Sequence, residues 1–247
     1  AGERDSLADV LPSSDYESSD TFQDVDHAAE LLADLIEAAA VARPGQPIDL
    51  AAHSLGGVVA RRAVELLDQR GRLGEGPDAL PVAVVLTIGS PHQGADLAAA
   101  AVAIEGTPTA MLVDQLTEYR GAVSVHQLAG AGSIALPSPR DPPPGVVAVS
   151  VAAATDLIVG AEHAIWPGAD NVLVSPGSAA GEGDDGGSVH SSLPGRHEVQ
   201  EALARAAGGL RQRCAALADV VTSTLAARGI STVEDLATAL LGIDRFL

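Results

Sequence analysis

The sequence predicts an α/β fold in which helices cover both faces of a parallel sheet. Short apolar segments alternate with segments of helical spacing, which is the order expected of parallel strands joined by crossover helices. The segment 81–89 (PVAVVLTIG) is an almost continuous apolar run, as expected of a strand that is buried on both faces. The chain has 247 residues, of which 47% are hydrophobic, so it can build one sizeable core.

Four segments are predicted to be strands. The first, 48–52 (IDLAA), and the second, 81–89, are followed by 145–156 (GVVAVSVAAATD) and 171–175 (NVLVS). Each is apolar and short, and turn-forming residues lie near its ends.

Helical segments surround these strands. Apolar residues recur at i, i+3 and i+4 over residues 22–42, where Asp20 or Thr21 is expected to cap the helix, and "RPGQP" ends it. A second helix is expected over about 56–69, directly after the first strand. The tail from Pro194 also has helical spacing.

These elements predict three regions. Residues 1–21 are rich in Ser and Asp and are interpreted as a flexible arm or the remnant of an upstream region. Residues 22–209 form the core, with an Ala-rich cap segment of helices and turns at about 96–144. Residues 210–247 form a C-terminal helical extension.

The charge of the chain excludes several classes of partner. The formal net charge is −19, and all 14 basic residues are Arg, so the surface should repel nucleic-acid phosphates and anionic lipid headgroups. No run of 18 apolar residues predicts a membrane span, and no signal peptide is visible in the first residues, which leaves the localisation open. The oligomeric state is also open.

No cofactor or metal is expected. No spacing of His, Cys, Asp and Glu indicates a strong metal site. The one cysteine, Cys214, rules out a disulfide within the chain and is interpreted as a structural thiol in a helix.

Ser54 lies at an abrupt junction between a predicted strand and a predicted helix. Such a turn exposes the serine Oγ at the end of the sheet and requires small residues two positions before and after it, here Ala52 and Gly56, with Gly57 beyond. The Leu55 N–H then lies at a helix N-terminus, where it can donate to a developing oxyanion. The alternative role for Ser54 is that of an ordinary helix N-cap.

A nucleophilic serine needs a base and an acid that orients the base. In sheets of this kind the chain order is Ser, acid, His, and Asp156 ends the third predicted strand. Asp170, Glu162 and Asp184 are rival acids, none of which directly ends a strong strand. His190 is preferred as the base because it lies on a predicted loop at the strand ends.

The other histidines have weaker claims. His197 falls inside the first turns of a helix, where a His more often packs or faces solvent. His92, at the end of the second strand, is expected to be a wall of the site, and His53 is expected to pack in the turn with its side chain away from Oγ. Three further histidines have no supporting context: His27, His126 and His163.

Four segments together resemble the lipase/esterase branch of the α/β-hydrolase superfamily. They are "DLAAHSLGGVVAR", "LTIGSPHQGA", "ATDLIV" and "VHSSLPGRHEV". The resemblance covers roughly residues 20–207 and is closest to the GPI inositol-deacylase-like and triacylglycerol-lipase-like groups. It implies hydrolysis of carboxylic esters with apolar acyl groups.

The resemblance also implies a role for each site residue. Ser54 would be the nucleophile, Asp156 the acid, His190 the base and the Leu55 N–H one oxyanion donor. The segment from Asp96 to Pro144 would include a cap over the acyl pocket.

The chain departs from this family at its front. The second oxyanion donor of the family comes from a loop after an earlier strand, commonly His-Gly, and residues 1–21 contain neither. We therefore expect the chain to be the C-terminal two thirds or so of a hydrolase, with the nucleophile strand at a sheet edge and weak or no activity in isolation.

Two other functions fit the same residues. An acyltransferase would use the same triad with a different acceptor. A hydrolase-like module without chemistry would serve as a binding or scaffold domain, a hypothesis favoured somewhat by the extra C-terminal helices.

Overall fold

The computed structural model describes residues 20, 22–104, 122–130, 136–156, 158–174, 189–210 and 212. Nearly all of the predicted arm, much of the predicted cap and nearly all of the predicted C-terminal extension lie outside these residues, as do Asp184 and Cys214.

Four parallel strands form one sheet in the order β1-β2-β3-β4. They are β1 (Ile48–His53), β2 (Val82–Ile88), β3 (Val147–Ala153) and β4 (Asp170–Val174). The bounds of each strand differ from those of its predicted segment by no more than a few residues. The agreement follows because each strand is a short apolar run between turn residues. In the described part of the chain β1 is an outer strand, as the sequence predicted.

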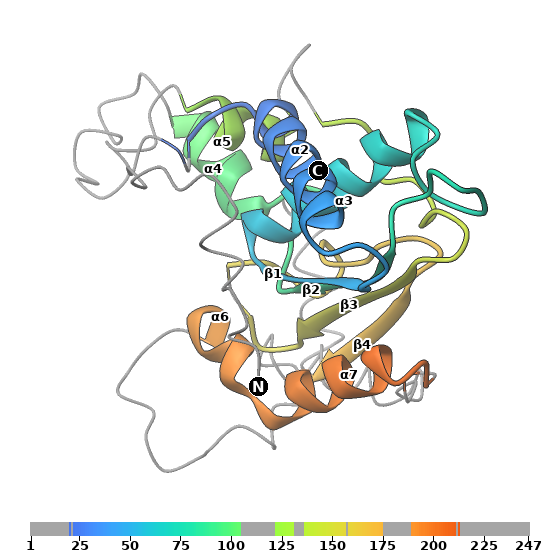
Figure 1. Cartoon of the computed structure of the whole chain (residues 1–247). Coiled ribbons are helices and arrows are strands. Elements are labelled where there is room, and N and C mark those ends of the chain that lie inside the picture. Colours follow the sequence, from blue (N-terminus) through green and yellow to red (C-terminus); the bar gives the residue numbers. More distant parts are fainter. Residues whose placement is uncertain are drawn as a thin grey trace.

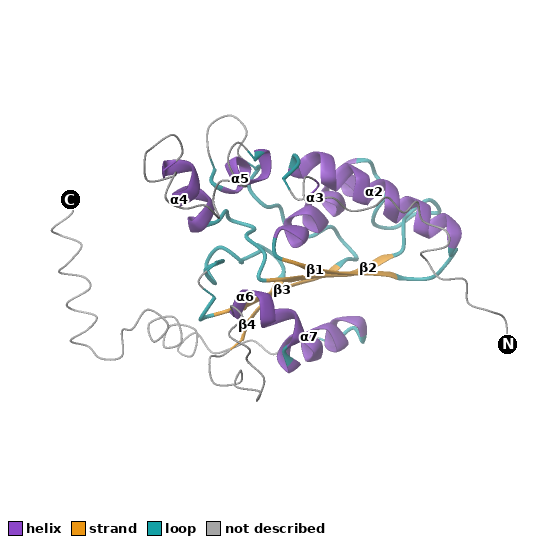
Figure 2. Cartoon of the chain, turned by 90° about the vertical axis from the view of Figure 1, so that its left-hand side faces the viewer, coloured by secondary structure: helices purple, strands orange, loops and turns teal. Residues whose placement is uncertain are grey.

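Helices lie on both faces of this sheet, which confirms the predicted fold class (Figure 1). The helices α2 (Val25–Ala42) and α3 (Leu55–Gln69) cover one face, and α7 (His197–Ala207) covers the other. Figure 2 shows α4 (Asp96–Ile104) and α5 (Val123–Leu128) on the α2–α3 side, beside the end of α3. The short helix α6 (Val189–Ser192) and the 3₁₀ helix η6 (Leu193–Gly195) precede α7.

Two apolar clusters hold these layers together, one on each face of the sheet. Ala29, Ala33 and Ile36 of α2 pack with Val64 and Leu67 of α3 above the sheet. Below the sheet, strands β2 and β3 pack against Leu193 and the α7 residues Val199, Ala202 and Ala206. The second cluster anchors η6 and α7, and so fixes the segment that carries His190.

The N-cap of α2 differs from the prediction. Asp24 caps the helix, since its Oδ1 accepts hydrogen bonds from the N–H groups of Asp26 and His27 at 2.8 and 3.1 Å. Asp20 and Thr21 precede that position. Asp and Thr are favoured N-cap residues, so the sequence alone did not distinguish between the possible caps of this helix.

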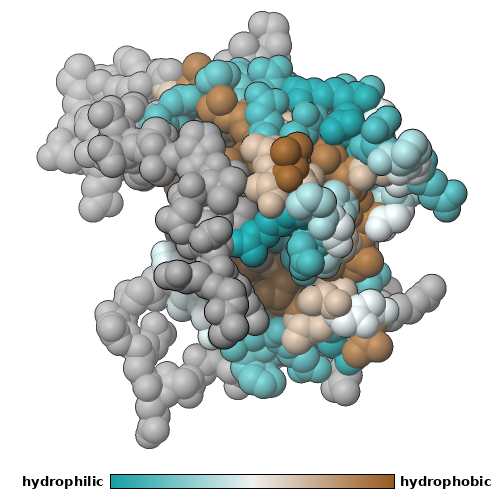
Figure 3. Space-filling view, viewed as in Figure 1, coloured by the Kyte–Doolittle hydropathy of each residue, from teal (hydrophilic) through white to brown (hydrophobic). Residues whose placement is uncertain are grey.

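The surface of the described residues carries both hydrophilic and hydrophobic side chains. On the face seen in Figure 3, hydrophobic surface is visible at mid-height, between the helices above and below the sheet. In β1 the residues Asp49 and Ala51 are exposed, whereas Ile48 and Leu50 are partly buried against α2 and α3. None of the described helices is both long and apolar enough to cross a membrane.

Candidate active site

Ser54 occupies a strained turn between β1 and α3. Its φ is +56° and its ψ is −131°, and it is the one non-glycine residue of the described chain with a positive φ. Such a conformation costs on the order of 1–3 kcal/mol and is concentrated at functional sites. Ser54 makes no side-chain capping hydrogen bond to α3, which removes the alternative role of an ordinary N-cap.

The close approach of strand and helix falls at Gly57. A Cβ on Gly57 would lie 1.9 Å from Ser90 Oγ and 3.0 Å from Thr87 Cβ, so only glycine fits there. Among the described residues, a Cβ on Gly56 would meet nothing within 4 Å. The tight contact predicted at Ala52 and Gly56 is therefore wrong by one residue on the helix side, because the neighbour that sets the limit is the chain at the end of β2.

Ser54, His190 and Asp156 are joined in a chain of hydrogen bonds. His190 Nε2 lies 2.8 Å from Ser54 Oγ, and His190 Nδ1 lies 2.7 Å from Asp156 Oδ2. A carboxylate accepts, so Nδ1 carries the proton and Nε2 is free to accept from the serine hydroxyl. The structure thus brings together the three side chains that the sequence selected.

Asp156 is held by its own backbone as well as by His190. It follows β3 by three residues, and its Oδ1 accepts hydrogen bonds from the N–H groups of Ile158 and Val159 at 2.9 and 3.1 Å. Burial alone would raise the pKa of Asp156, but the hydrogen bonds from His190 and from these N–H groups outweigh it, so the pKa lies below its ordinary value. The rivals Asp170 and Glu162 are exposed.

His190 lies in the short helix α6 and not on a loop as predicted. Its ring also packs against the backbone after β2, because a Cβ on Gly89 would lie 3.3 Å from His190 Nδ1 and Cε1. His197 is exposed at the start of α7, consistent with its expected solvent-facing position.

His92 is buried at 3% exposure, apart from the Ser54 hydrogen-bond chain. Its Nε2 lies 2.9 Å from Thr87 Oγ1, and its ring lies 5.4 Å from that of Trp166. Burial, and then the charge of Arg61, lower the pKa of His92 to about 3, so it is neutral at physiological pH. It lines a pocket of about 240 Å³ with residues from the Gln93–Ala95 loop, α5 and the 136–139 segment, but not with Ser54, Asp156 or His190.

A second pocket lies beside the turn that carries Ser54. It has a volume of about 210 Å³. Its lining comes from the start of α2 and the first turns of α3: Asp20, Gln23, Val25, Ala28, Leu55, Gly56 and Val59. Leu55 is the first residue of α3, whose first N–H groups have no partner within the helix. An apolar pocket and a helix N-terminus therefore adjoin the serine.

His53, directly before Ser54, lies against His190. Its Nε2 lies 2.9 Å from the carbonyl oxygen of His190, and the two imidazole rings are 4.6 Å apart. Its position directly before Ser54 was visible in the sequence, but a contact across 137 positions was not.

The remaining polar groups give no sign of a metal centre. Among the described residues, no group of three or more His, Cys, Asp and Glu side chains is arranged to hold a metal ion. The three histidines without context in the sequence, His27, His126 and His163, lie outside the hydrogen-bond chain of Ser54.

Fold and site together define a class of protein. A parallel sheet, a strained serine at a strand–helix turn and the chain order Ser, Asp, His are the features of an α/β-hydrolase.

The family comparison points the same way. Residues 4–125, just under half of the chain, match the model of the family described as "Putative serine esterase (DUF676)". The matched segment includes Ser54 and His92, and Asp156 and His190 follow it. The chain is therefore similar to this family over its first half. No curated protein sequence matches it significantly.

Three solved structures show the range of the structural matches. A mature lipase of Bacillus licheniformis is 17% identical, with a TM-score of 0.39 and coverage of 61% of this chain and 66% of the lipase. The thioesterase RedJ of the prodiginine pathway in Streptomyces coelicolor is 22% identical, with a TM-score of 0.34 and 60% coverage of both chains. A lipase-esterase related protein of Clostridium acetobutylicum is 12% identical, with a TM-score of 0.41 and coverage of 79% and 78%. The chain spans just under two thirds of the first of these.

Proposed function

We propose that this chain is a serine hydrolase that cleaves carboxylic esters of apolar acyl groups through an acyl-enzyme on Ser54. The observation that carries the proposal is the continuous hydrogen-bond chain from Ser54 Oγ through His190 to Asp156 Oδ2. A serine hydroxyl in line with a correctly protonated imidazole is activated for attack on an acyl carbon.

The reaction would proceed in two halves. Ser54 Oγ attacks the acyl carbon while His190 Nε2 takes its proton, and the Leu55 N–H donates to the oxyanion. His190 then gives the proton to the leaving alcohol, and the acyl group stays on Ser54. Water, deprotonated by His190, attacks the acyl carbon, and Ser54 Oγ leaves with the proton as the acid is released.

The ionised Asp156 supports both halves. It holds the proton of His190 on Nδ1 and stabilises the imidazolium that forms each time His190 accepts a proton. Its lowered pKa keeps it charged across the neutral range.

The pocket beside Leu55 supports an apolar acyl group of limited size. Val25, Ala28 and Val59 contribute an apolar lining, and the volume of about 210 Å³ is small beside the roughly 300–1,000 Å³ of most ligand pockets. We therefore expect short acyl chains to be preferred over long ones.

Covalent labelling by a fluorophosphonate tests the nucleophile. The wild-type chain should be labelled at Ser54, and Ser54→Ala should not be labelled. Ser138→Ala, a change at an exposed serine, is the matched control and should be labelled as the wild type. Absence of label on the folded wild-type chain, with folding checked by circular dichroism, contradicts the proposal.

A panel of p-nitrophenyl esters of increasing chain length tests the substrate class. Turnover should fall once the acyl chain exceeds the pocket. Product analysis with a competing alcohol then separates hydrolysis from transfer, since free acid is the expected main product.

A further inference from the structure

His53 holds a contact that the hydrolytic mechanism above does not use. Its Nε2 lies 2.9 Å from the main-chain oxygen of His190. A carbonyl oxygen can only accept, so Nε2 of His53 carries a proton and donates it. The residue directly before the nucleophile is thus bonded to the main chain of the base.

Several contacts of the described residues position His190. Its ring is fixed by Asp156 and Ser54, its neighbour Leu193 is buried in the lower core, and the bond from His53 fixes its main chain. Because His53 ends β1 and Ser54 follows at once, this bond ties the base to the same strand end that carries the nucleophile.

The charge state of His53 matters as well. Its ring centroid is 4.6 Å from that of His190, and Asp156 is the other charged group that acts on it. Burial, and then the nearby His190, lower the pKa of His53, which favours its neutral form. A neutral His53 does not repel the His190 imidazolium that forms during the reaction.

We propose that His53 is a positioning residue, whose Nε2–H fixes the main chain of His190 over Ser54. This inference rests on the proposed hydrolase function. It assigns no contact with substrate to His53 itself.

Two substitutions separate the hydrogen bond from ring packing. His53→Phe keeps a ring against His190 and removes the donor, and His53→Gln keeps an N–H donor near the Nε2 position and removes the ring. We expect His53→Phe to lower kcat on the order of tenfold to a hundredfold with a much smaller change in KM, since small misplacements of a catalytic group cost this much. His53→Gln should recover most of that loss.

The pH profile gives a readout that packing alone would not change. In the wild type, a proton taken up by His53 at acid pH places a positive charge beside the His190 ring, so log kcat/KM should fall steeply on the acid side. In His53→Gln this charge cannot form, and log kcat/KM should fall less steeply there. Unfolding curves at each pH restrict the comparison to folded protein.

The possible failures are distinguishable. A wild-type chain that fluorophosphonate does not label overturns the proposed hydrolase function. If the wild type is labelled and active, but His53→Phe retains the wild-type kcat, or His53→Gln loses as much as His53→Phe, the positioning role is wrong. An acid side that is equally steep in the wild type and in His53→Gln also overturns it.

Discussion

The φ of +56° at Ser54 is stabilised by the residues around it and not by Ser54 itself. Its N–H donates to the Ile88 carbonyl of β2 at 2.9 Å, and its carbonyl accepts from Gly57. Both bonds are to main-chain atoms, so a change of the Ser54 side chain should leave the turn intact. The Oγ is therefore held by the turn in line with His190.

Gly89 is the residue that leaves room for the His190 ring. Ala at this position would place Cβ 3.3 Å from Nδ1 and Cε1 of His190, tighter than ordinary contact, and would also strain a φ of +53°. We expect Gly89→Ala to lower kcat at least tenfold by displacing the His190 ring, a magnitude on the order of that seen for small misplacements of a catalytic group. Steady-state kinetics on a short-chain ester measure it.

Gly71→Ala is the control for Gly89→Ala. Gly71 has a φ of +66°, and among the described residues a Cβ added to it would meet nothing within 4 Å. Gly71→Ala therefore has the same kind of backbone strain as Gly89→Ala but makes no contact with His190. Both variants should lose about 1–2 kcal/mol of stability. An equal loss of kcat in both would show that strain, and not contact with His190, is responsible.

At the scale of elements, α3 approaches the end of β2 so closely that a single methyl group decides the fit. Gly57→Ala places Cβ 1.9 Å from Ser90 Oγ, and Ser90 is fully buried, so the helix or the strand end must move. We expect a loss of about 1–3 kcal/mol in the free energy of unfolding, as for other overpacked sites. Gly56→Ala, one residue earlier, faces open space and should not destabilise the protein in the same urea titration.

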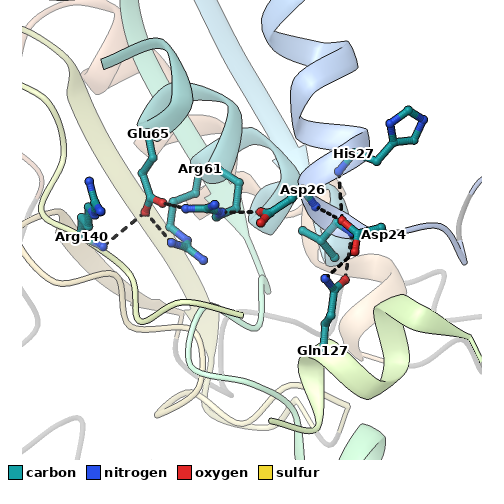
Figure 4. Close-up of polar contacts among 9 residues, drawn as sticks. Asp24, Asp26, His27, Arg61, Glu65, Gln127 and Arg140 are labelled. Carbon is teal, nitrogen blue, oxygen red and sulfur yellow. Dashed lines mark hydrogen bonds and ion pairs between the residues drawn. The ribbon is translucent and has the colours of Figure 1, made fainter. Parts of the chain in front are cut away.

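Buried charges also join α2, α3 and the Arg140 loop (Figure 4). Glu65, 2% exposed, accepts hydrogen bonds from Arg61 and Arg62 of its own helix and from the N–H of Arg140 at 3.3 Å. Arg62 also donates to Asp26 of α2 at 2.7 Å. At the same end of α2, Gln127 of α5 accepts from the N–H of Val25 and donates to Asp24.

Removal of Glu65 should be costly because Arg61 is completely buried. Within the described part of the chain, Nε and Nη2 of Arg61 already have no hydrogen-bond partner, so Glu65→Ala would leave a buried cation without its closest counter-charge. We expect a loss of about 3–5 kcal/mol. Asp34→Ala breaks the exposed pair with Arg70 and should change stability by less than about 1 kcal/mol, as urea unfolding would show.

For the whole molecule, His92 should make stability depend on pH. The unfolded chain binds a proton at His92 below about pH 6.5, whereas the folded chain does so only near pH 3. Stability contributed by the neutral ring is therefore present at pH 7 and falls as the pH decreases, by at most about 1.4 kcal/mol per pH unit in this window.

His92→Gln should reduce this acid sensitivity. Between pH 7 and pH 5 its unfolding free energy should fall by about 2 kcal/mol less than that of the wild type. His197→Gln, at an exposed position, should behave as the wild type. Equal pH dependence in all three proteins would assign the acid sensitivity to other groups.

The sequence predicted the strands and the three residues of the hydrogen-bond chain because those signals are local. Apolar runs mark β1 to β4, and the order of Ser54, Asp156 and His190 follows from the turn after β1 and the acid after β3. It did not predict the partner of Gly57, the bond from His53 or the burial of Arg61. Each of these is fixed by a residue distant in sequence or by a neighbouring helix, and charged residues such as Arg61 are rarely buried.

The separation of 136 positions between Ser54 and His190 also constrains how the molecule folds. Contacts that close long loops form late, because chain entropy must be lost before they contribute. During refolding the sheet and α3 should therefore acquire their circular dichroism signal before the serine becomes reactive. Short pulses of fluorophosphonate at successive times during refolding would then measure the rate at which α6 docks.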